Sequence, residues 1–285
     1  MKKALCLFVS LLLVLALCSC GEEVPTIAEW TLVTQQSRQL AKGVDYMQLT
    51  YEDAEGLPYR LYVLTVDPDK SYLHTGTVDD SYNLMPQRGQ NVADQMRCAS
   101  ENGIHAIAAV NGDFFSIKST YMPSGLCIKD GTVIRENSNY RPFSAFTKDG
   151  QYIICDGKLD KVAYDTLSVA VGGSHVIVRN GMPYDLQQDS EFSITSHPRT
   201  LSGVKEDGTI LFVVIDGRQP KHSNGAPLER CARIMIALGA KDAINHDGGG
   251  SSTMILHDTD EYITANTPSD GTLRDVYNSI LIVPK

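Results

Sequence analysis

The sequence predicts an α+β fold, with a single domain built on mixed, largely antiparallel sheets and a few packed helices. Short apolar runs rich in β-branched and aromatic residues recur along the chain, as expected for β-strands. Two segments have helical periodicity, and their places between strands would also suit an α/β sheet. Turns of the Asp-Gly type favour antiparallel hairpins and therefore the α+β class.

Four segments have the composition and length of strands. They are residues 59–66 (YRLYVLTV), 105–110 (HAIAAV), 209–215 (TILFVVI) and 279–283 (SILIV). The first of them ends at Asp67-Pro68, which is a turn signal. Further hairpin turns are expected at residues 129–131 (KDG), 147–150 (TKDG) and 206–208 (EDG).

Two segments are predicted to be amphipathic helices. Residues 91–99 form the first, and Gly103 can end it. Residues 227–238 form the second, with Pro227 in the first turn and Gly239 just after the end. Their apolar faces consist of Val92, Met96 and Ala99 in the first helix and Leu228, Cys231, Met235 and Leu238 in the second.

Residues 1–19 are predicted to be a lipoprotein signal peptide. Two lysines precede an apolar stretch, residues 5–17, that is too short to span a bilayer comfortably. The segment LCSC resembles a bacterial lipobox, so Cys20 is expected to be lipidated; an ordinary cleavage site is the alternative. Residues 20–29 would then be a tether and residues 30–285 the folded domain. This domain would lie outside the cytoplasm, on the outer side of the cytoplasmic membrane or in the periplasm or outer membrane.

Composition limits the partners. The net charge of −9 argues against non-specific nucleic-acid binding, so an anionic ligand would need local arginines. The lipid anchor is the expected contact with the membrane. The cysteines beyond the signal and Cys20 are expected to be buried thiols, although their number allows three disulfide pairings. They are Cys98, Cys127, Cys155 and Cys231.

Three consecutive glycines stand in NHDGGGSST, residues 245–253. Each glycine loses more backbone entropy on folding than any other residue, so either the loop is slack or something approaches its backbone closely. The spacings of a P-loop and of a dinucleotide-binding turn are both absent. We expect a turn between strands in which free backbone N–H groups and the hydroxyls of Ser251 and Ser252 form an anion-binding nest. A tight hairpin that needs positive φ is the alternative.

Other polar motifs lie next to predicted strands, where loops on a rigid scaffold commonly build sites. An arginine in such a loop offers a planar fork that matches phosphate or carboxylate oxygens. Each motif alone is typical of an ordinary turn, but together they predict a shared cleft. The motifs are NGDFF at 111–115, HPRT at 197–200, DGRQ at 216–219 and LRDVYN at 273–278.

In this order, AVNGDFF, HPRTLSGV, VVIDGRQ, LGAKDAINHDGGGSSTM and RDVYNSILIV resemble the phosphodiester glycosidase family. The resemblance extends from about residue 43 and is strongest from residue 106. His246 departs from the pattern, since relatives often carry an apolar residue there. The residues that match the family's motif positions are Asn111, Arg199, Asp216, Arg218, Asn245, Asp247, Gly248, Gly249, Gly250, Ser251 and Arg274.

The resemblance implies hydrolysis of the sugar–phosphate bond in a glycosyl phosphodiester or phosphoglycan, with release of sugar and a phosphomonoester. The leaving phosphate has a second pKa of about 6, so it needs charge neutralisation more than a proton. A carboxylate would stabilise the oxocarbenium-like sugar or activate water. The candidate catalytic residues are Asp247, Asp216, Arg199 and His197. The candidate substrate- and phosphate-binding residues are Asn111, Asp113, Arg218, Asn245, Gly248, Gly249, Gly250, Ser251 and Arg274.

Several alternatives stay open at this point. His197 could be a general acid or could order its loop through hydrogen bonds. No cofactor is expected, but a metal-dependent phosphodiesterase could use a divalent cation held by carboxylates and histidines. A serine hydrolase could use Ser251 or Ser252, although no GxSxG elbow is present. A lipid-anchored protein could also bind a phosphoglycan without cutting it. The possible metal ligands are Asp113, Asp216, Asp247, His197 and His246.

Overall fold

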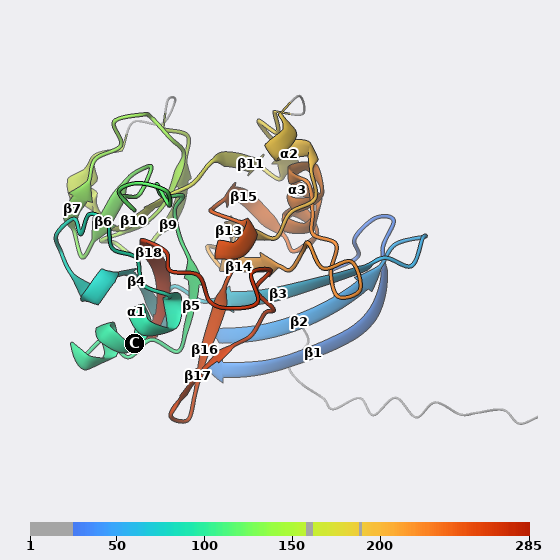
Figure 1. The fold of residues 1–285 in the computed structure, drawn as a ribbon, viewed down its shortest axis with the longest axis horizontal. Helices are drawn as coiled ribbons and strands as arrows, with labels where there is room; N and C mark the ends of the chain where they lie inside the picture. The colour runs from blue at the N-terminus through green and yellow to red at the C-terminus, as the bar shows by residue number, and fades with distance from the viewer. Residues whose placement is uncertain (1–24, 158–161, 188–189) are drawn as a thin grey trace, which may run out of the picture.

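The computed structural model describes residues 25–157, 162–187 and 190–285. It confirms the predicted α+β class, because antiparallel sheets are the main regular structure of the described chain and short helices cover them (Figure 1). The predicted signal peptide, 1–19, and Cys20 lie outside the described residues.

The largest sheet has eight strands in the order β1-β2-β3-β14-β13-β15-β11-β12, and all neighbouring strands are antiparallel. Strands β1 to β3 are the curved blue strands at the lower right of Figure 1. The strands of this sheet are β1 (Thr31–Ala41), β2 (Val44–Glu52), β3 (Pro58–Val66), β11 (His175–Arg179), β12 (Met182–Pro183), β13 (Arg199–Lys205), β14 (Ile210–Ile215) and β15 (Ala240–Asn245).

Two five-stranded antiparallel sheets complete the scaffold. One, in the order β7-β6-β10-β8-β9, consists of β6 (Cys127–Lys129), β7 (Thr132–Arg135), β8 (Phe143–Thr147), β9 (Tyr152–Cys155) and β10 (Leu167–Gly172). The other, in the order β17-β16-β5-β18-β4, consists of β4 (Ser71–Thr77), β5 (Ala108–Asn111), β16 (Met254–Asp258), β17 (Glu261–Thr264) and β18 (Asn278–Pro284). The four predicted strands correspond to β3, β5, β14 and β18, and the predicted turns close the hairpins β6–β7, β8–β9 and β13–β14.

Both predicted helices are present. Asn91 begins α1 by accepting a hydrogen bond from the backbone N–H of Asp94, and Gly103 follows the helix at φ 88°. Gly239 follows α3, also at φ 88°. The helices are α1 (Val92–Glu101), α2 (Glu191–Ile194) and α3 (Leu228–Ala237), and the 3₁₀ turns are η1 (Val78–Asp80), η2 (Tyr164–Thr166) and η3 (Gly249–Ser251).

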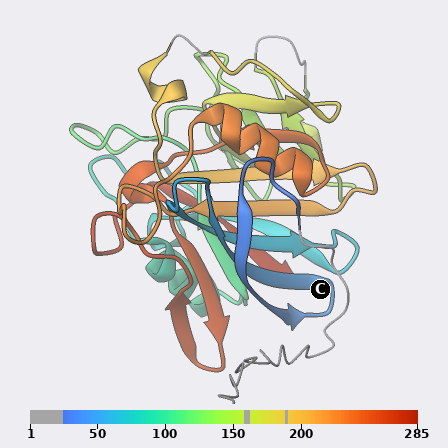
Figure 2. The ribbon, with the colours of Figure 1, turned by 90° about the vertical axis from the view of Figure 1, so that its right-hand side faces the viewer.

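The hydrophobic core lies where the three sheets meet. One buried cluster takes Phe212 and Val214 from the large sheet, Val171 from the second and Val110 from the third. Helix α3 covers the other face of the large sheet, along β11, β13 and β15 (Figure 2), and α1 packs on β4, β5 and β18. Because the sheets share a core, their strand ends are fixed relative to one another.

The segment before the large sheet is packed against the domain rather than free. Ile27 is buried in the α3 cluster, and the Tyr51 hydroxyl donates a hydrogen bond to the carbonyl of Pro25 at 2.7 Å. The Trp30 ring stacks on Tyr59 at 3.9 Å. The folded domain therefore includes residues 25–29, which the sequence placed in the tether.

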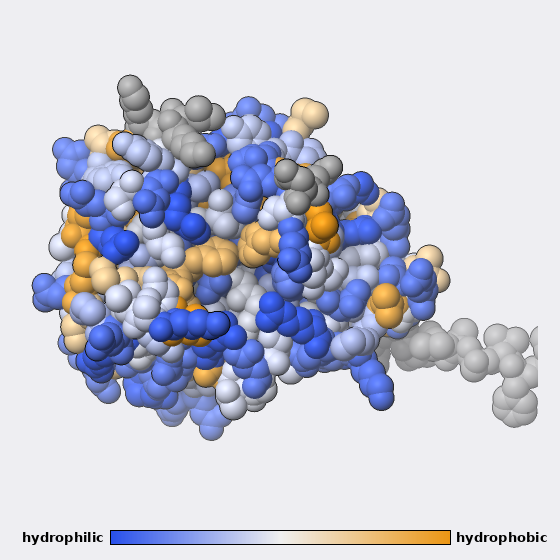
Figure 3. Space-filling view, turned by 45° about the horizontal axis from the view of Figure 1, so that its top comes forward, coloured by the Kyte–Doolittle hydropathy of each residue, from blue (hydrophilic) through white to orange (hydrophobic). Residues whose placement is uncertain are grey.

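The thiols of Cys127, Cys155 and Cys231 are buried, and that of Cys98 is half-buried. The first three agree with the expectation of buried thiols. On the face drawn in Figure 3 the surface is mainly hydrophilic, with apolar residues in a few patches. Within the described ranges, no helix has the length and apolar character needed to cross a membrane.

The strand order brings the predicted polar motifs together at the ends of neighbouring strands. In the large sheet, Arg199 at the start of β13 is paired with Ile215 at the end of β14, and Asn245 ends the neighbouring β15. In the third sheet, Asn111 at the end of β5 is paired with Ser279 near the start of β18. The loops that continue from these strand ends build the site.

We expect Gly203→Val to destabilise the protein by about 3 kcal/mol, because overpacking a buried site typically costs that order. A Cβ at Gly203, in the middle of β13, would lie 2.7 Å from Cε of Met235 in α3 and 2.8 Å from the carbonyl oxygen of Asp242. Urea denaturation measures the loss. Thr132→Val, on the exposed part of β7, is the control and should change stability by no more than about 0.5 kcal/mol. Equal stabilities for the two variants would contradict the packing of α3 on β13.

Candidate active site

A pocket of about 160 Å³ opens where the loops after β5, β14 and β15 meet those before β13 and β18. It contains eight of the thirteen residues proposed from the sequence. Its lining consists of Phe114, Phe192, His197, Pro198, Arg199, Arg218, Asp247, Gly248, Gly249, Gly250 and Arg274.

The three glycines are needed because other groups approach their backbone closely. A Cβ at Gly248 would lie 2.6 Å from the carbonyl oxygen of Pro198, and one at Gly250 would lie 2.1 Å from Nη2 of Arg274. Gly249 has φ 63°, and a Cβ there would lie 3.0 Å from Nη1 of Arg218. The loop is therefore a surface on which two guanidinium groups rest.

The glycine N–H groups differ from the predicted anion nest. The N–H of Gly248 donates to the Asp247 carboxylate at 2.9 Å, and that of Gly249 donates to the carbonyl of Pro198 at 2.9 Å. Both donors are thus occupied within the protein. The groups that can bind an anion here are mainly the guanidinium side chains above the loop.

Arg218 and Arg274 supply positive charge from two different loops. Arg218 has φ 61°, an uncommon conformation for a residue other than glycine, and its Nη2 lies 3.3 Å from Nδ1 of His197. Arg274 is held by Asp270, with Nε and Nη2 at 2.9 and 2.6 Å from the same carboxylate oxygen. Its Nη1 donates to the Ser251 hydroxyl at 3.3 Å. Two fixed guanidinium groups at one pocket form a site for an anion with several oxygens.

Arg199 also lines the pocket, but its side chain is fully buried. Its Nε donates to the carbonyl of Ala226 at 2.9 Å, and its Nη2 donates to the carbonyls of Phe192 and Thr195 at 2.7 and 3.0 Å. Nη1 has no hydrogen-bond partner within the described residues. Arg199 therefore fixes the segment around α2 and retains one donor nitrogen.

Asp247 contributes a half-buried carboxylate to the pocket lining. Burial raises its pKa to about 6, although hydrogen bonds from Ser251 and Gly248 and the charge of Arg274 act in the opposite direction. A carboxylate with this pKa is mostly ionised at neutral pH and can still exchange a proton nearby. These are properties of a general base or an electrostatic stabiliser.

Asp113 is a buried carboxyl group that interacts electrostatically with Asp247. Its Oδ2 accepts a hydrogen bond from the N–H of Gly125 at 2.6 Å, whereas Oδ1 has no partner in the described part of the chain. Burial raises the pKa of Asp113 to about 7; the charge of Arg141 lowers it, and that of Asp247 raises it further. Arg141 also lowers the pKa of Asp247, so one guanidinium acts on both carboxyl groups.

The two histidines near the site have different environments. Burial and the charges of Arg199 and Arg218 lower the pKa of His197, so its ring is neutral at pH 7. Arg218 donates to Nδ1, which leaves the proton on Nε2. His246 is buried away from the pocket, between the carbonyl of Gly172 at 2.9 Å and the Ser202 hydroxyl at 2.8 Å. Burial lowers the pKa of His246 to about 4.

The remaining proposed residues lie behind the lining or away from it. Asn111 fastens the Asp247 loop: its Nδ2 donates to the carbonyl of Asp247 at 2.8 Å, and its Oδ1 accepts from the N–H of Thr253 at 3.0 Å. Asn245 donates to Ser174 and to the carbonyl of its neighbour at 2.9 and 2.7 Å. Asp216 is buried, does not line the pocket, and is surrounded by hydrogen-bond donors. Whether these residues serve the chemistry directly stays a prediction.

Phe192, which lines the pocket, and Arg141, which lies close to it, were not identified from the sequence. Phe192 comes from α2, and its ring meets that of Phe114 edge to face at 5.9 Å. Arg141 lies above Phe114, with 5.4 Å between its guanidinium carbon and the ring centroid. The only sequence signal for Phe114 was its place in the NGDFF motif. Phe192 and Arg141 lie in segments without any pattern.

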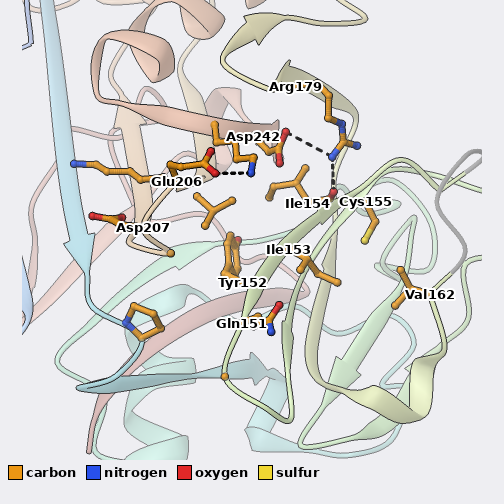
Figure 4. A pocket seen from close by; sticks show the side chains of 16 residues that line it. Gln151, Tyr152, Ile153, Ile154, Cys155, Val162, Arg179, Glu206, Asp207 and Asp242 are labelled. Atoms are coloured by element: carbon orange, nitrogen blue, oxygen red, sulfur yellow. Dashed lines mark hydrogen bonds and ion pairs between the residues drawn. The ribbon is translucent and has the colours of Figure 1, made fainter.

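A larger cavity, of about 840 Å³, lies at the other end of β13 and β15 (Figure 4). Among its charged side chains, Arg179 contacts Asp242 at 3.7 Å, and Lys241 contacts Glu206 at 3.0 Å. None of the thirteen proposed site residues lines it. In the described part of the chain, none of its carboxylates is a buried group that lacks a hydrogen-bond partner. The smaller pocket is therefore the candidate active site.

The residues considered for a metal centre do not form one cluster. Asp216 and His246 have partners outside the pocket, and within the described ranges no group of three His, Cys, Asp or Glu side chains is spaced to hold a metal ion. Ser251, considered as a nucleophile, interacts with the Asp247 carboxylate and with Arg274 rather than with a histidine.

The sequence model of the phosphodiester glycosidase family matches residues 105–283, which include every residue of the pocket lining. The chain belongs to the phosphodiester glycosidase family. Members of this family act on phosphodiester-linked sugars, and the family and fold are those of hydrolases.

Solved structures have the same fold. The catalytic domain of zebrafish N-acetylglucosamine-1-phosphodiester alpha-N-acetylglucosaminidase, auto-inhibited by its pro-peptide, matches with a TM-score of 0.68 at 19% identity over 89% of each chain. A Burkholderia pseudomallei protein designated as exported matches with a TM-score of 0.62 at 16% identity, over 94% of this chain and 99% of that one. The Bacillus subtilis prophage-derived protein YomE is 22% identical over 254 residues. The chain spans about a third of that relative, since the match covers 88% of this chain and 35% of YomE.

We expect Asp113→Asn to stabilise the protein at pH 8 by about 4 kcal/mol relative to wild type. The pKa of Asp113 rises from 3.8 to about 7 on folding, so between these values the folded state binds more protons than the unfolded state. Wild-type stability therefore falls as the pH rises through this window, and the amide removes that loss. Urea denaturation at pH 4 and pH 8 measures the effect.

The control for this prediction is Asp258→Asn. Asp258 is exposed, and its pKa is lowered by Arg38, so its amide variant should gain no stability at high pH. A stability difference between Asp113→Asn and wild type that is the same at pH 4 and pH 8 would show that Asp113 ionises normally in the folded protein.

Proposed function

We propose that the protein hydrolyses the bond between the anomeric carbon of a sugar and the phosphate oxygen in a glycosyl phosphodiester. The observation that carries the proposal is the juxtaposition of one half-buried carboxylate, Asp247, with two guanidinium groups from separate loops, in a pocket that is also lined by two aromatic rings. The products are the free sugar and a phosphomonoester.

The phosphate would bind between Arg218 and Arg274, above the glycine loop. Cleavage moves the electron pair of the C–O bond onto a phosphate oxygen and so increases the negative charge on this group. Fixed guanidinium groups stabilise that charge without reorganisation. The leaving phosphomonoester has a second pKa of about 6 and can depart at neutral pH without a strong general acid. His197, whose Nδ1 accepts from Arg218, would donate its Nε2 proton in a hydrogen bond to the leaving phosphate.

The sugar would lie on the Phe114 and Phe192 side of the pocket, because aromatic rings suit the apolar face of a sugar ring. Asp247 would face the anomeric carbon and stabilise its oxocarbenium character. Water then bonds to this carbon, and its proton passes to Asp247 or to solvent. Because the pKa of Asp113 is about 7, this group is partly protonated at neutral pH. The proton reduces the negative charge of the Asp113–Asp247 pair.

A panel of α- and β-linked sugar phosphodiesters tests the proposal. Free sugar and a phosphomonoester, identified by mass spectrometry and ³¹P NMR, are the expected products from at least one member. Binding without any product would instead support a phosphoglycan-binding protein. Release of a sugar phosphate with loss of the second substituent would point to a phosphodiesterase.

On a cleaved substrate, Asp247→Asn should lower kcat by about 10²–10⁴-fold, because the amide cannot act as a base or carry the charge. Arg218→Ala and Arg274→Ala should each lower kcat/KM by about 10²–10³-fold, the loss typical of one preorganised donor. Steady-state kinetics at pH 7 measure both effects. Arg230→Ala, which removes a guanidinium paired with Glu29 away from the pocket, is the matched control. Loss of activity in the control, or full activity in Asp247→Asn, would refute the assignment.

We also propose that the protein is an exported lipoprotein anchored through Cys20. The support is the LCSC segment after an apolar stretch and the fold shared with a protein designated as exported. Cys20→Ser should abolish incorporation of labelled palmitate and release the protein from the membrane fraction of the expressing bacterium. Cys18→Ser is the matched control and should keep the label. Labelling of Cys20→Ser, or none in wild type, would refute the anchor.

A further inference from the structure

The carboxylate of Asp216 holds together the loops that carry both phosphate-facing arginines. Asp216 begins the loop that contains Arg218, and its side chain is 1% exposed. Nε2 of His222, at the far end of the same loop, lies 2.7 Å from Oδ2 of Asp216. The Ser223 hydroxyl donates to the backbone carbonyl of Asp216 at 2.7 Å. The two ends of this loop are therefore joined by hydrogen bonds at Asp216.

The same carboxylate binds the segment that leads to Arg274. The backbone N–H of Thr267 donates to Oδ1 and Oδ2 of Asp216 at 3.1 and 3.0 Å. Nδ2 of Asn266 donates to Oδ1 at 3.0 Å and to the carbonyl of Ser252 at 3.0 Å. Asn266 therefore extends the contact to the end of the glycine loop.

A direct link between the two loops strengthens this arrangement. Nε2 of Gln219, next to Arg218, donates to the carbonyl of Thr267 at 2.9 Å. The remaining donor to Asp216 is the Tyr62 hydroxyl, at 2.9 Å, which comes from the rigid strand β3 rather than from a loop. One buried carboxylate thus joins the Arg218 loop, the Arg274 segment and the glycine loop to the large sheet.

We propose that Asp216 is a positioning residue that sets the separation of Arg218 and Arg274 and thereby the affinity of the site for phosphate. This inference rests on the proposed function, because it assumes that the two arginines bind phosphate. Asp216 has no role in bond breaking here: it does not line the pocket, and both carboxylate oxygens are occupied by donors.

An asparagine at position 216 cannot replace the carboxylate. It offers one acceptor oxygen and one NH₂ donor, so the NH₂ group would face donors that the second carboxylate oxygen now accepts. At least one loop must then release its contact. A displacement of about 1 Å in a positioned group can cost on the order of 100-fold in function, so we expect a loss of this order in phosphate affinity.

The test compares full-length wild type with Asp216→Asn, His222→Ala and Tyr62→Phe. Isothermal titration with inorganic phosphate measures the site without turnover, and hydrogen exchange by mass spectrometry measures the order of residues 216–225 and 264–274. Asp216→Asn should bind phosphate roughly 100-fold more weakly and exchange faster in both segments. His222→Ala should accelerate exchange in 216–225 only, with an intermediate affinity. Tyr62→Phe, which removes a donor without releasing a loop, should match wild type in both readouts.

Other results would contradict the positioning role of Asp216 or separate it from the proposed reaction. Wild-type phosphate affinity in Asp216→Asn together with lost turnover would assign Asp216 to the chemistry and overturn the inference. Wild-type exchange in both segments would overturn it as well. If Asp216→Asn does not fold, a wild-type affinity in His222→Ala overturns it. If no sugar phosphodiester is cleaved but the phosphate and exchange pattern appears, the inference stands and the proposed reaction fails.

Discussion

The site depends on holding an ionised, half-buried carboxylate, that of Asp247, in the lining of a small pocket. Burial alone would keep Asp247 protonated, and its raised pKa records that tendency. The Ser251 hydroxyl, the N–H of Gly248 and the charges of Arg274 and Arg141 offset part of the cost. Gly248 and Ser251 belong to the same loop as Asp247, whereas Arg141 and Arg274 come from segments distant in the sequence, and a core shared by three sheets fixes these segments. The fold therefore pre-organises charge before any substrate arrives.

Close approach is the second requirement, and the glycine loop supplies it. A side chain at Gly249 or Gly250 would occupy the space of the Arg218 and Arg274 guanidinium groups. These glycines lose backbone entropy on folding, but their lack of side chains lets the Arg218 and Arg274 guanidinium groups lie against the loop that follows Asp247. Phe114 and Phe192 add an apolar surface to the same pocket. One pocket thus offers separate surfaces to the two halves of a sugar phosphodiester.

Periodicity and turn chemistry were sufficient to predict the main strands, hairpins and helices, because each is a local property of the sequence. The convergence of motifs at strand ends could also be anticipated, and eight proposed residues line one pocket. The hydrogen-bonding environment of each carboxylate could not be predicted from the sequence. Asp113 and Asp216 both lie in Gly-containing turns after apolar strands. In the structure, Asp113 has an oxygen without a described partner, whereas Asp216 is surrounded by donors. Phe192 and Arg141 reach the site only through tertiary packing.

The central claim is that the protein breaks the bond between the sugar carbon and oxygen and leaves the phosphorus–oxygen bonds intact. Hydrolysis of a cleaved sugar phosphodiester in ¹⁸O-labelled water, followed by mass spectrometry of both products, tests this directly. The account predicts that the label appears in the free sugar and that the phosphomonoester is unlabelled. Label in the phosphate product would mean that water attacks phosphorus, and it would contradict the roles given to Asp247 and the two arginines.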